Sequence, residues 1–523
     1  MVLSPRNFVL LGSPESAQTF ASGRSNLFTY TNLGSSPVNF VTKGAIGDAD
    51  IVVNDGSVLQ SMAGFGASLT DSSAKLLGSM KVYPISEFPL GPPTSRPAVG
   101  LPLQDAHTST WMLIRGSQTV YSFDDTWLDT SLLNFNINNA PAYLFSTIKD
   151  IMSVNPYLKV HLVPWSPPAW MKSSGTMKGG SFISSYSTVY ANYLLKALQG
   201  FKSKGITAYA IGIQNEPENS NPTYPTCLIS ASQEAQIGTT LRSLMNSNGF
   251  SNTKIVGFEH NWNHAGAYPV QLMESAYNAF SGVAFHCYSG SVGQQDTFEA
   301  AYPNKDIYFT ECTGEYGSDW WSDIKWYMDN IFVGAVENYA KSGLMWNLVL
   351  DGTGKPELPG SNSCGTPCRP VVTVNTDGTY TLHQEFYAMA AASKAVTPKD
   401  SNGPFAQRIS VSVGGSTSWA LRVTAYVTAR ANSADWLRYS LVVLNWDDTN
   451  NGAWSPTPVK TTIEFRGKQA TYTFPVGVTT LWWYAPNEGV SRRDAGANAT
   501  EEFAYAQTED GPRKAFRFHR TEV

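Results

Sequence analysis

The chain between about residues 61 and 390 alternates short apolar runs with longer stretches of helical periodicity. Seven apolar runs end in polar residues, which is the pattern of buried strands. They are Gly64–Ser68, Lys159–Pro164, Thr207–Ile213, Lys254–Phe258, Gly282–His286, Asp306–Thr310 and Gly343–Val349. The amphipathic stretches between them are typical of helices, as in Thr188–Lys204, Ser232–Asn246 and Trp320–Lys341. Repeated strand-then-helix units predict an α/β fold, a (β/α)₈ TIM barrel, over residues 61–390.

From residue 391 to 484 the helical periodicity stops. Five runs alternate or are continuously apolar, with Gly, Asn and Asp between them: Ile409–Val413, Trp419–Tyr426, Arg438–Leu444, Thr461–Phe465 and Thr479–Trp483. This pattern predicts an attached β-sandwich domain. The short strands of residues 24–60 precede the barrel, and we expect them to pair with the sandwich. Residues 1–23 and 485–523 carry no such pattern, and we expect them to be tails.

The composition allows a large hydrophobic core and gives no indication of nucleic-acid binding. The chain has 523 residues, of which 42% are hydrophobic, which suits a barrel with a smaller partner domain. Its net charge of -5 gives no electrostatic reason to bind nucleic acid. No window of about 20 apolar residues occurs, so no transmembrane segment is expected. Nothing in the pattern requires a partner chain, and we expect a monomer.

The low charge content and the many aromatic residues are typical of secreted, extracellular proteins. Only 15% of the residues are charged, and the chain has 15 Trp and 25 Tyr. The apolar run Phe8–Leu11 is too short for the hydrophobic region of a signal peptide, so a signal peptide is not evident. We therefore expect secretion from the composition alone.

Five cysteines allow at most two disulfides and leave one thiol free. Cys364 and Cys368 are close enough in sequence to close a small loop. Cys287 and Cys312 follow strand runs, and we expect them to be buried thiols. The chain has no Cys-x-x-Cys pair and no His-Glu-x-x-His sequence, which predicts neither a metal site nor a cofactor.

Two glutamates lie where apolar strands end. Glu216 follows Thr207–Ile213 in the segment Gln214–Pro217, and Glu311 follows Asp306–Thr310. The carboxyl ends of parallel barrel strands face one cleft, so these two carboxylates are expected to flank a glycosidic bond. Three other glutamates compete for these roles, and we expect them to be solvated or supporting: Glu218, Glu259 and Glu315. Glu259 is the strongest rival because it directly follows a strand.

Aromatic residues gather at the same strand ends. They occur in Pro164–Lys172, in His286–Tyr288 and at Trp346. A single aromatic residue is usually part of a core, but several at the ends of strands that also carry two glutamates favour a sugar-binding subsite.

At this point the chain resembles glycoside hydrolase family 30, the family of glucosylceramidases and fungal endo-β-1,6-glucanases. The resemblance covers roughly residues 50–390 and rests on ordered segments: Gly64–Asp71, Pro164–Lys172, Gln214–Pro217, His286–Tyr288, Thr310–Cys312 and Trp346–Leu348. It implies retaining hydrolysis of β-linked glucosides, with a β-glucan or another β-glucoside as the substrate.

The resemblance also implies individual roles. Glu216 would be the general acid/base and Glu311 the nucleophile, and Asn215 would hold the sugar 2-hydroxyl. The −1 subsite would be lined by Trp165, Tyr288 and Trp346. Because the acid must be protonated at working pH, we expect the surroundings of Glu216 to raise its pKa.

One region departs from the family. Between the first and third strands the family has an Arg-x-Pro strand that ends in an Asp-Phe-Ser segment, and its Asp binds sugar. Residues 81–116 are proline-rich and atypical here, and no Asp follows Arg115. A substitute second strand is expected at Trp111–Ile114. A true divergence and a faulty gene model both explain this segment.

Three readings therefore remain for the function. The first is an endo-β-1,6-glucanase acting on fungal-type β-glucan. The second is a glucosylceramidase or a xylan-active relative, which would differ in the loops around the cleft. The third is a carbohydrate-binding protein that has lost its activity together with the second-strand segment.

Overall fold

Eight parallel strands form the framework of the larger domain. The computed structural model describes residues 9–12, 38–80, 112–113, 120–361, 363–364 and 367–487, and it leaves the side chains of 9–12 and 112–113 undescribed. The parallel strands are β5 (Gly64–Ala67), β6 (Met112–Leu113), β7 (Val160–Val163), β8 (Ala208–Gly212), β9 (Lys254–Asn261), β10 (Gly282–His286), β11 (Asp306–Glu311) and β13 (Ser342–Met345). All seven predicted barrel strands are present.

The parallel strands form a six-stranded sheet and a separate pair. The sheet has the order β11-β10-β9-β8-β7-β6, and β13 pairs in parallel with β5. The amide of Lys341 and the hydroxyl of Ser342 bond the backbone of β11, which brings the two sheets together. Among the described residues no ladder joins β5 to β6. The expected substitute strand is confirmed, because Met112–Leu113 pairs with β7.

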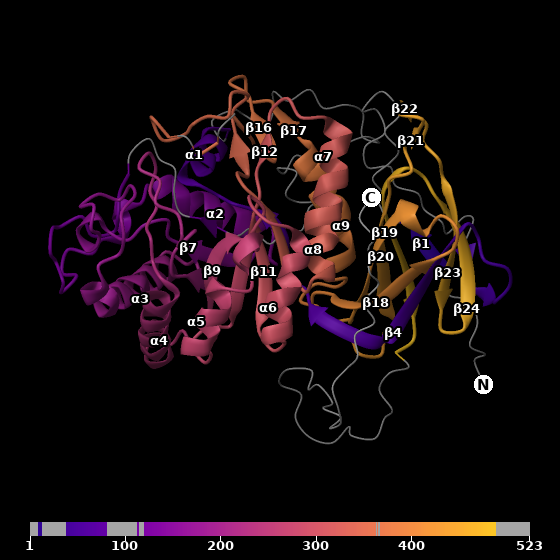
Figure 1. Cartoon of the computed structure of the whole chain (residues 1–523), viewed down its shortest axis with the longest axis horizontal. Helices are drawn as coiled ribbons and strands as arrows, with labels where there is room; N and C mark the ends of the chain where they lie inside the picture. Colours follow the sequence, from indigo (N-terminus) through magenta and orange to yellow (C-terminus); the bar gives the residue numbers. More distant parts are fainter. Residues whose placement is uncertain are drawn as a thin grey trace, which may run out of the picture. The chain divides into compact units, whose positions relative to one another are not determined.

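Helices follow most of the parallel strands and cover their outer side (Figure 1). They are α1 (Asp71–Met80), α2 (Ala142–Val154), α3 (Ser187–Ser203), α4 (Ala231–Ser247), α5 (Tyr268–Ala276), α6 (Gln295–Ala301), α7 (Trp320–Tyr327), α8 (Gly334–Glu337) and α9 (Gln384–Val396). Helix α4 begins at a capping box, in which the Ser230 and Gln233 side chains bond each other's backbone amides. Apolar side chains of these helices and strands share one large core.

Two predicted elements are divided in the structure. The helix expected over Trp320–Lys341 is α7, a π turn over Met328–Phe332 and then α8. The strand expected over Gly343–Val349 ends at Met345, and β14 (Val349–Leu350) pairs instead with β16 (Val372–Val374). Asn347, with φ of 62°, lies in the left-handed region, which interrupts an extended strand.

The β domain is one ten-stranded sheet. Its order is β2 (Val38–Asn39), β1 (Val9–Gly12), β25 (Gly477–Ala485), β20 (Leu437–Asn445), β19 (Leu421–Thr428), β18 (Gln407–Gly414), β4 (Ala49–Ser61), β23 (Val459–Phe465), β24 (Lys468–Phe474) and β3 (Val41–Thr42). As expected, N-terminal strands pair with C-terminal ones: β4 is antiparallel to β18 and parallel to β23. Strand β1 lies within the segment expected to be a tail.

The ten-stranded sheet packs on itself. Tyr439 of β20 and Phe465 of β23 are separated by three strands, yet their ring centroids are 4.7 Å apart. Phe40 contacts both Phe465 and Trp483 in the same cluster. The two ends of the sheet therefore enclose one aromatic core, as the two layers of a sandwich do.

Two disulfides occur among the described residues. Cys364–Cys368 closes the expected small loop, and Cys227 is a buried free thiol. The expectation of free thiols at Cys287 and Cys312 was wrong, because these two residues form a disulfide. They directly follow neighbouring parallel strands, β10 and β11, which places their Cα atoms 5.3 Å apart. No described helix combines the length and the apolar composition needed to cross a bilayer.

Candidate active site

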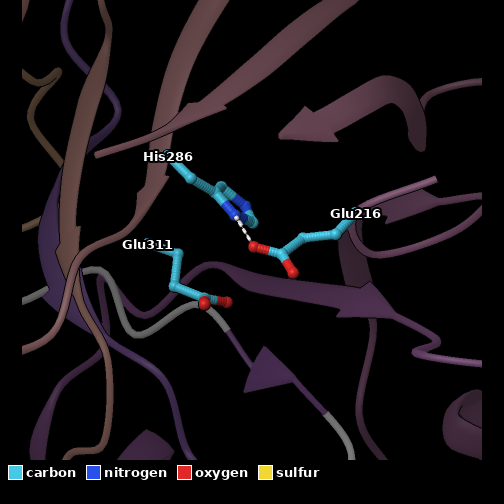
Figure 2. A group of neighbouring side chains, drawn as sticks. All are labelled: Glu216, His286 and Glu311. Atoms are coloured by element: carbon cyan, nitrogen blue, oxygen red, sulfur yellow. Dashed lines mark hydrogen bonds and ion pairs between the residues drawn. The ribbon is translucent and has the colours of Figure 1, made fainter. Parts of the chain in front are cut away.

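The predicted residues lie at the carboxyl ends of the parallel strands. Glu311 is the last residue of β11, and Tyr288 follows β10 by two positions. Glu216 follows β8, Trp165 follows β7, and Trp346 follows β13. Figure 2 shows Glu216, His286 and Glu311 with their side chains turned toward one another. Parallel strands bring their carboxyl ends to one side of a sheet, so residues far apart in sequence meet here.

The backbone around Glu216 is held in a tight turn. Glu216 has a φ of 47°, in the left-handed region, and Pro217 follows it. The amide of Asn215 donates to the Pro164 carbonyl at 2.8 Å, and the amide of Glu216 donates to the Glu259 carbonyl at 2.9 Å. These bonds tie the turn to the ends of β7 and β9. The backbone strain therefore persists because two neighbouring strands fix it.

The carboxylate of Glu216 is buried and has two side-chain partners. Asn219 Nδ2 donates to Oε2 at 2.8 Å, and His286 Nδ1 lies 3.2 Å from Oε1. Asn215 is also buried, and its Oδ1 accepts no hydrogen bond within the described part of the chain. A buried amide oxygen without a partner is unfavourable, so Asn215 is suited to bind a ligand hydroxyl.

The carboxylate of Glu311 is only 4% exposed. Tyr288 Oη donates to its Oε1 at 2.9 Å, whereas Oε2 has no partner among the described residues. One oxygen is thus held in place, and the other is left for a reacting atom.

The two carboxylates lie close to each other. Oxygen atoms of Glu216 and Glu311 and a ring nitrogen of His286 all lie within 4.8 Å of one another. These three groups are also of the types that bind metal ions, and no other such cluster of His, Cys, Asp and Glu was found in the described residues. Oε1 of Glu311 and both oxygens of Glu216 have side-chain partners, and Oε2 of Glu311 has none among the described residues.

Burial and mutual repulsion shift the proton affinities of the pair. Burial raises the pKa of Glu311 to about 7, with the charge of Glu216 adding to the rise and the charge of His286 opposing it. Burial also raises the pKa of Glu216, but the hydrogen bond and the charge of His286 outweigh it and lower that pKa. The predicted rise at Glu216 is therefore wrong for the ligand-free protein, because the sequence did not place His286 against Glu216. The two buried carboxylates repel each other, and the first proton that they take up favours Glu311.

Aromatic residues form one wall beside the carboxylates. The Trp165 and Trp346 rings stack with centroids 4.9 Å apart, and Tyr224 meets Trp165 edge-on at 5.8 Å. Asn219 donates to both Tyr224 and Glu216, which links the aromatic wall to the Glu216 carboxylate. These three aromatic residues border a cavity that is open to solvent. Its other lining includes Thr70, Tyr121, Asn347, Pro356, Leu358 and the disulfide Cys364–Cys368. The carboxylates themselves lie next to this cavity rather than in its lining.

The competing glutamates have three different environments. Glu315 is exposed, and Glu218 is paired with His264 at 2.6 Å. Glu259 is 1% exposed and lies between His161 and His286, so it is a buried supporting group rather than a solvated one. The sequence did not single out Asn219, Tyr224 or His161. Asn219 and Tyr224 follow Glu216 in an irregular loop, and such a segment has no periodicity that could reveal their direction.

The family has its sugar-binding Asp directly after the second strand, which corresponds to the residues after β6 in this chain. Residues 81–111 and 114–119 lie outside the described residues, so the expected departure from the family is not tested there. Tyr121, where the family pattern resumes, donates from its hydroxyl to Asp71 at 2.7 Å. The described part of this region is thus connected to the end of β5.

Comparison with known proteins agrees with this architecture. The chain is 29% identical over 449 residues to an endo-1,6-beta-D-glucanase of Neurospora crassa, covering 80% of this chain and 85% of that protein. It is 24% identical over 381 residues to putative glucosylceramidase 1 of Caenorhabditis elegans, covering 67% and 70%. The solved structure of the endo-beta1,6-glucanase BT3312 superposes with a TM-score of 0.73 at 25% identity, covering 92% and 99%.

Residues 62–396 match the glycosyl hydrolase family 30 TIM-barrel domain, which is more than half of the chain. The match spans both glutamates and every strand of the parallel sheets. The chain therefore belongs to glycosyl hydrolase family 30 and is a glycoside hydrolase.

Proposed function

We propose that this protein is a retaining endo-β-1,6-glucanase that cleaves β-1,6-linked glucan by double displacement. The observation that carries the mechanism is the closeness of the two buried carboxylates, whose oxygens lie within 4.8 Å. Retaining enzymes hold their carboxyl groups about 5–5.5 Å apart, whereas inverting enzymes need about 6.5–9.5 Å to admit a water. The family fold supplies the setting, and we infer that its eight parallel strands close into a complete (β/α)₈ barrel.

In the first step Glu311 attacks the anomeric carbon through Oε2, the oxygen without a described partner. Glu216 donates a proton to the departing glycosidic oxygen, and a covalent glycosyl-enzyme forms. The reactive form carries the proton on Glu216 and the charge on Glu311. Positive charge that develops at the anomeric carbon in the transition state is stabilised by ionised Glu311, so the reaction proceeds through this form although the ligand-free pair favours the proton on Glu311.

In the second step Glu216 acts as a base and takes a proton from water, which attacks the anomeric carbon and releases Glu311. Asn215 holds the 2-hydroxyl of the sugar with its unpartnered Oδ1. The −1 subsite is completed by Trp165, Tyr288 and Trp346. The rings supply apolar faces for the sugar, and Tyr288 keeps the nucleophile in place.

The preference for β-1,6 linkages rests on the relatives. The Neurospora crassa protein and the solved structure described above are both named as endo-1,6-glucanases. Caenorhabditis elegans relatives are named as putative glucosylceramidases, which makes glucosylceramide the second substrate to test. We further propose that the protein is secreted, since two disulfides suit an oxidising compartment.

A substrate panel tests the proposal. The purified chain and its Glu311→Gln variant are assayed on β-1,6-glucan, β-1,3-glucan, xylan and glucosylceramide. We expect release of β-1,6-linked oligosaccharides by the wild type and none by the variant. Proton NMR during early hydrolysis should show the β-anomer appearing first. If the protein prefers xylan or glucosylceramide, that compound would replace β-1,6-glucan as the proposed substrate. Binding of glucan without cleavage would support an inactive carbohydrate-binding protein.

A further inference from the structure

Glu259 is a buried carboxylate that the double displacement does not use. It is 1% exposed and lies in β9, next to the strand that precedes Glu216. Thr310 Oγ1 donates to its Oε2 at 2.6 Å, and His161 Nε2 is 3.2 Å from its Oε1. His286 Nε2 is 3.7 Å from Oε2, which is an ion-pair distance and too long for a hydrogen bond.

Only one of these neighbours supplies a compensating charge. Burial lowers the pKa of His161 to about 4, so this ring is neutral at pH 7. Burial also lowers the pKa of His286, but the charges of Glu311 and Glu216 and the side-chain contacts with Glu216 and Glu259 outweigh it and raise that pKa to about 10. A buried carboxylate without a compensating charge is strongly unfavourable. The 3.7 Å contact lets the Glu259 carboxylate stabilise a protonated His286 ring.

The same histidine contacts the acid/base on its other side. His286 Nδ1 lies 3.2 Å from Oε1 of Glu216, so a protonated ring presents an N–H to that carboxylate. Glu259 also reaches Glu216 through the backbone, since its carbonyl accepts the Glu216 amide at 2.9 Å. Glu259 is thus connected to Glu216 in two ways: through the His286 side chain and through a backbone hydrogen bond.

The backbone of β9 is distorted at this point. Phe258 and Glu259 have φ values of 70° and 48°, both in the left-handed region. The pairing of β10 with β9 shifts register between Val283 and Phe285, as a bulge requires. Residues held this way are strained and persist where surrounding structure fixes them, often at functional sites. The bulge allows Glu259 to face His286 while its carbonyl faces Glu216.

We propose that Glu259 is a positioning residue for the acid/base: it holds His286 as a cationic donor toward Glu216. In the first step Glu216 becomes negative as it protonates the leaving group. The His286 N–H stabilises that charge, so proton transfer to the leaving group becomes easier. This inference rests on the proposed retaining mechanism and adds a third carboxylate to it.

Several other ionisable groups face the Glu259–His286 pair and are part of any pH response. They are Glu216 after β8, Glu311 of β11, His161 of β7, His260 of β9 and Glu234 of α4. Glu234 offers a matched control. It is fully buried, accepts the Phe258 amide at 3.1 Å on the other side of the same bulge, and makes no hydrogen bond or ion pair with His286 in the described part of the chain.

Leaving-group dependence separates positioning from general support. Glu259→Gln and Glu234→Gln are compared with the wild type on β-1,6-glucan and on the 2,4-dinitrophenyl glycoside of a β-1,6-linked diglucoside. We expect Glu259→Gln to lower kcat on glucan by about 10- to 100-fold, part of the contribution of a general acid. The dinitrophenyl substrate, which needs no protonation, should change less than about threefold. Glu259→Asp, which keeps the charge, should recover part of the loss. Equal losses on both substrates, or equal losses in the two Gln variants, would overturn the proposal.

A second measurement needs no substrate, and its first reading is made on the wild type. Nitrogen-15 NMR of histidine-labelled wild type, with His286 identified by comparison with His286→Gln, should show a doubly protonated ring at pH 7. In Glu259→Gln its titration should move to lower pH, and in Glu234→Gln it should move much less. A neutral His286 ring in the wild type at pH 7 would exclude the cationic donor. This result is independent of the substrate, so it distinguishes a failure of this inference from a failure of the proposed function.

Discussion

Tyr288 donates its phenol hydroxyl to Oε1 of Glu311 at 2.9 Å, across the ends of two neighbouring parallel strands. The same two strand ends are joined by the disulfide Cys287–Cys312, one residue from each partner. Glu311, the proposed nucleophile, and its hydrogen-bond donor Tyr288 are therefore positioned by a covalent link as well as by the sheet. The last residue of β10 and the two residues after it have three different contacts. His286 contacts Glu216, Cys287 forms the disulfide, and Tyr288 donates to Glu311.

Removing the Tyr288 hydroxyl should weaken the nucleophile without removing it. Hydrogen bonds to charged groups contribute about 1.5–3 kcal/mol, so Tyr288→Phe should lower kcat/KM by roughly 10- to 150-fold. Steady-state kinetics on the preferred glucan measures this loss. Tyr277→Phe, a change at a partly exposed tyrosine on the helical side, is the control and should leave the kinetics unchanged. Parallel behaviour of the two variants would contradict the role given to Tyr288.

Replacing Glu311 by glycine should abolish catalysis while leaving a space at the anomeric carbon. We expect a loss on the order of 10⁴-fold or more, as when other covalent nucleophiles are removed. Azide should then restore cleavage of an activated aryl glycoside and yield the α-glycosyl azide, since it attacks from the face that Glu311 occupied. Mass spectrometry and NMR identify this product. A β-configured azide would point to Glu216 as the nucleophile and reverse the two assignments.

The stacked pair Trp165 and Trp346 should contribute to substrate binding. Trp346→Phe keeps an aromatic core residue but reduces the ring face, and we expect kcat/KM to fall about tenfold, mainly through KM. Trp326→Phe is a matched control, since Trp326 is 40% exposed on α7. An unchanged KM in Trp346→Phe, measured together with its melting temperature, would show that this residue serves packing alone.

The parts of the fold that repeat along the sequence were predictable, because strands buried on both faces leave apolar runs of defined length. The positions of Glu216, Glu311 and Tyr288 followed from the ends of those runs. The contacts of Glu259 with His161 and His286 did not, because they depend on a bulge at Phe258 and Glu259 that no periodicity marks. The Cys287–Cys312 pairing was missed for a similar reason. It depends on which strands are neighbours, and the pattern of apolar residues does not predict strand order.

The shared proton of the carboxylate pair should set the upper limit of the pH range. Activity requires one proton on the pair, and burial raises the pKa of Glu311 to about 7. As pH rises through this value the pair loses the proton and Glu216 can no longer act as an acid. We expect kcat/KM on glucan to fall about tenfold per unit above roughly pH 7. With a dinitrophenyl leaving group the decline should be shallower, and an equally steep decline would show that another group controls it.

The elevated pKa of Glu311 also predicts a gain in stability when its charge is removed. Below pH 4.5 this residue is protonated in both the folded and the unfolded chain. Between pH 4.5 and about 7 only the unfolded chain releases the proton, so stability falls as pH rises and stays lower above pH 7. The cost is on the order of 1–3 kcal/mol, because Glu216 shares the proton.

Glu311→Gln, which keeps the shape and an acceptor for Tyr288, should therefore melt a few degrees above the wild type at pH 8 and near it at pH 4.5. Calorimetry at both pH values measures the difference, with exposed Glu315→Gln as the control. A variant less stable than the wild type at pH 8 would mean that the Glu311 carboxylate is stabilised rather than strained by its surroundings.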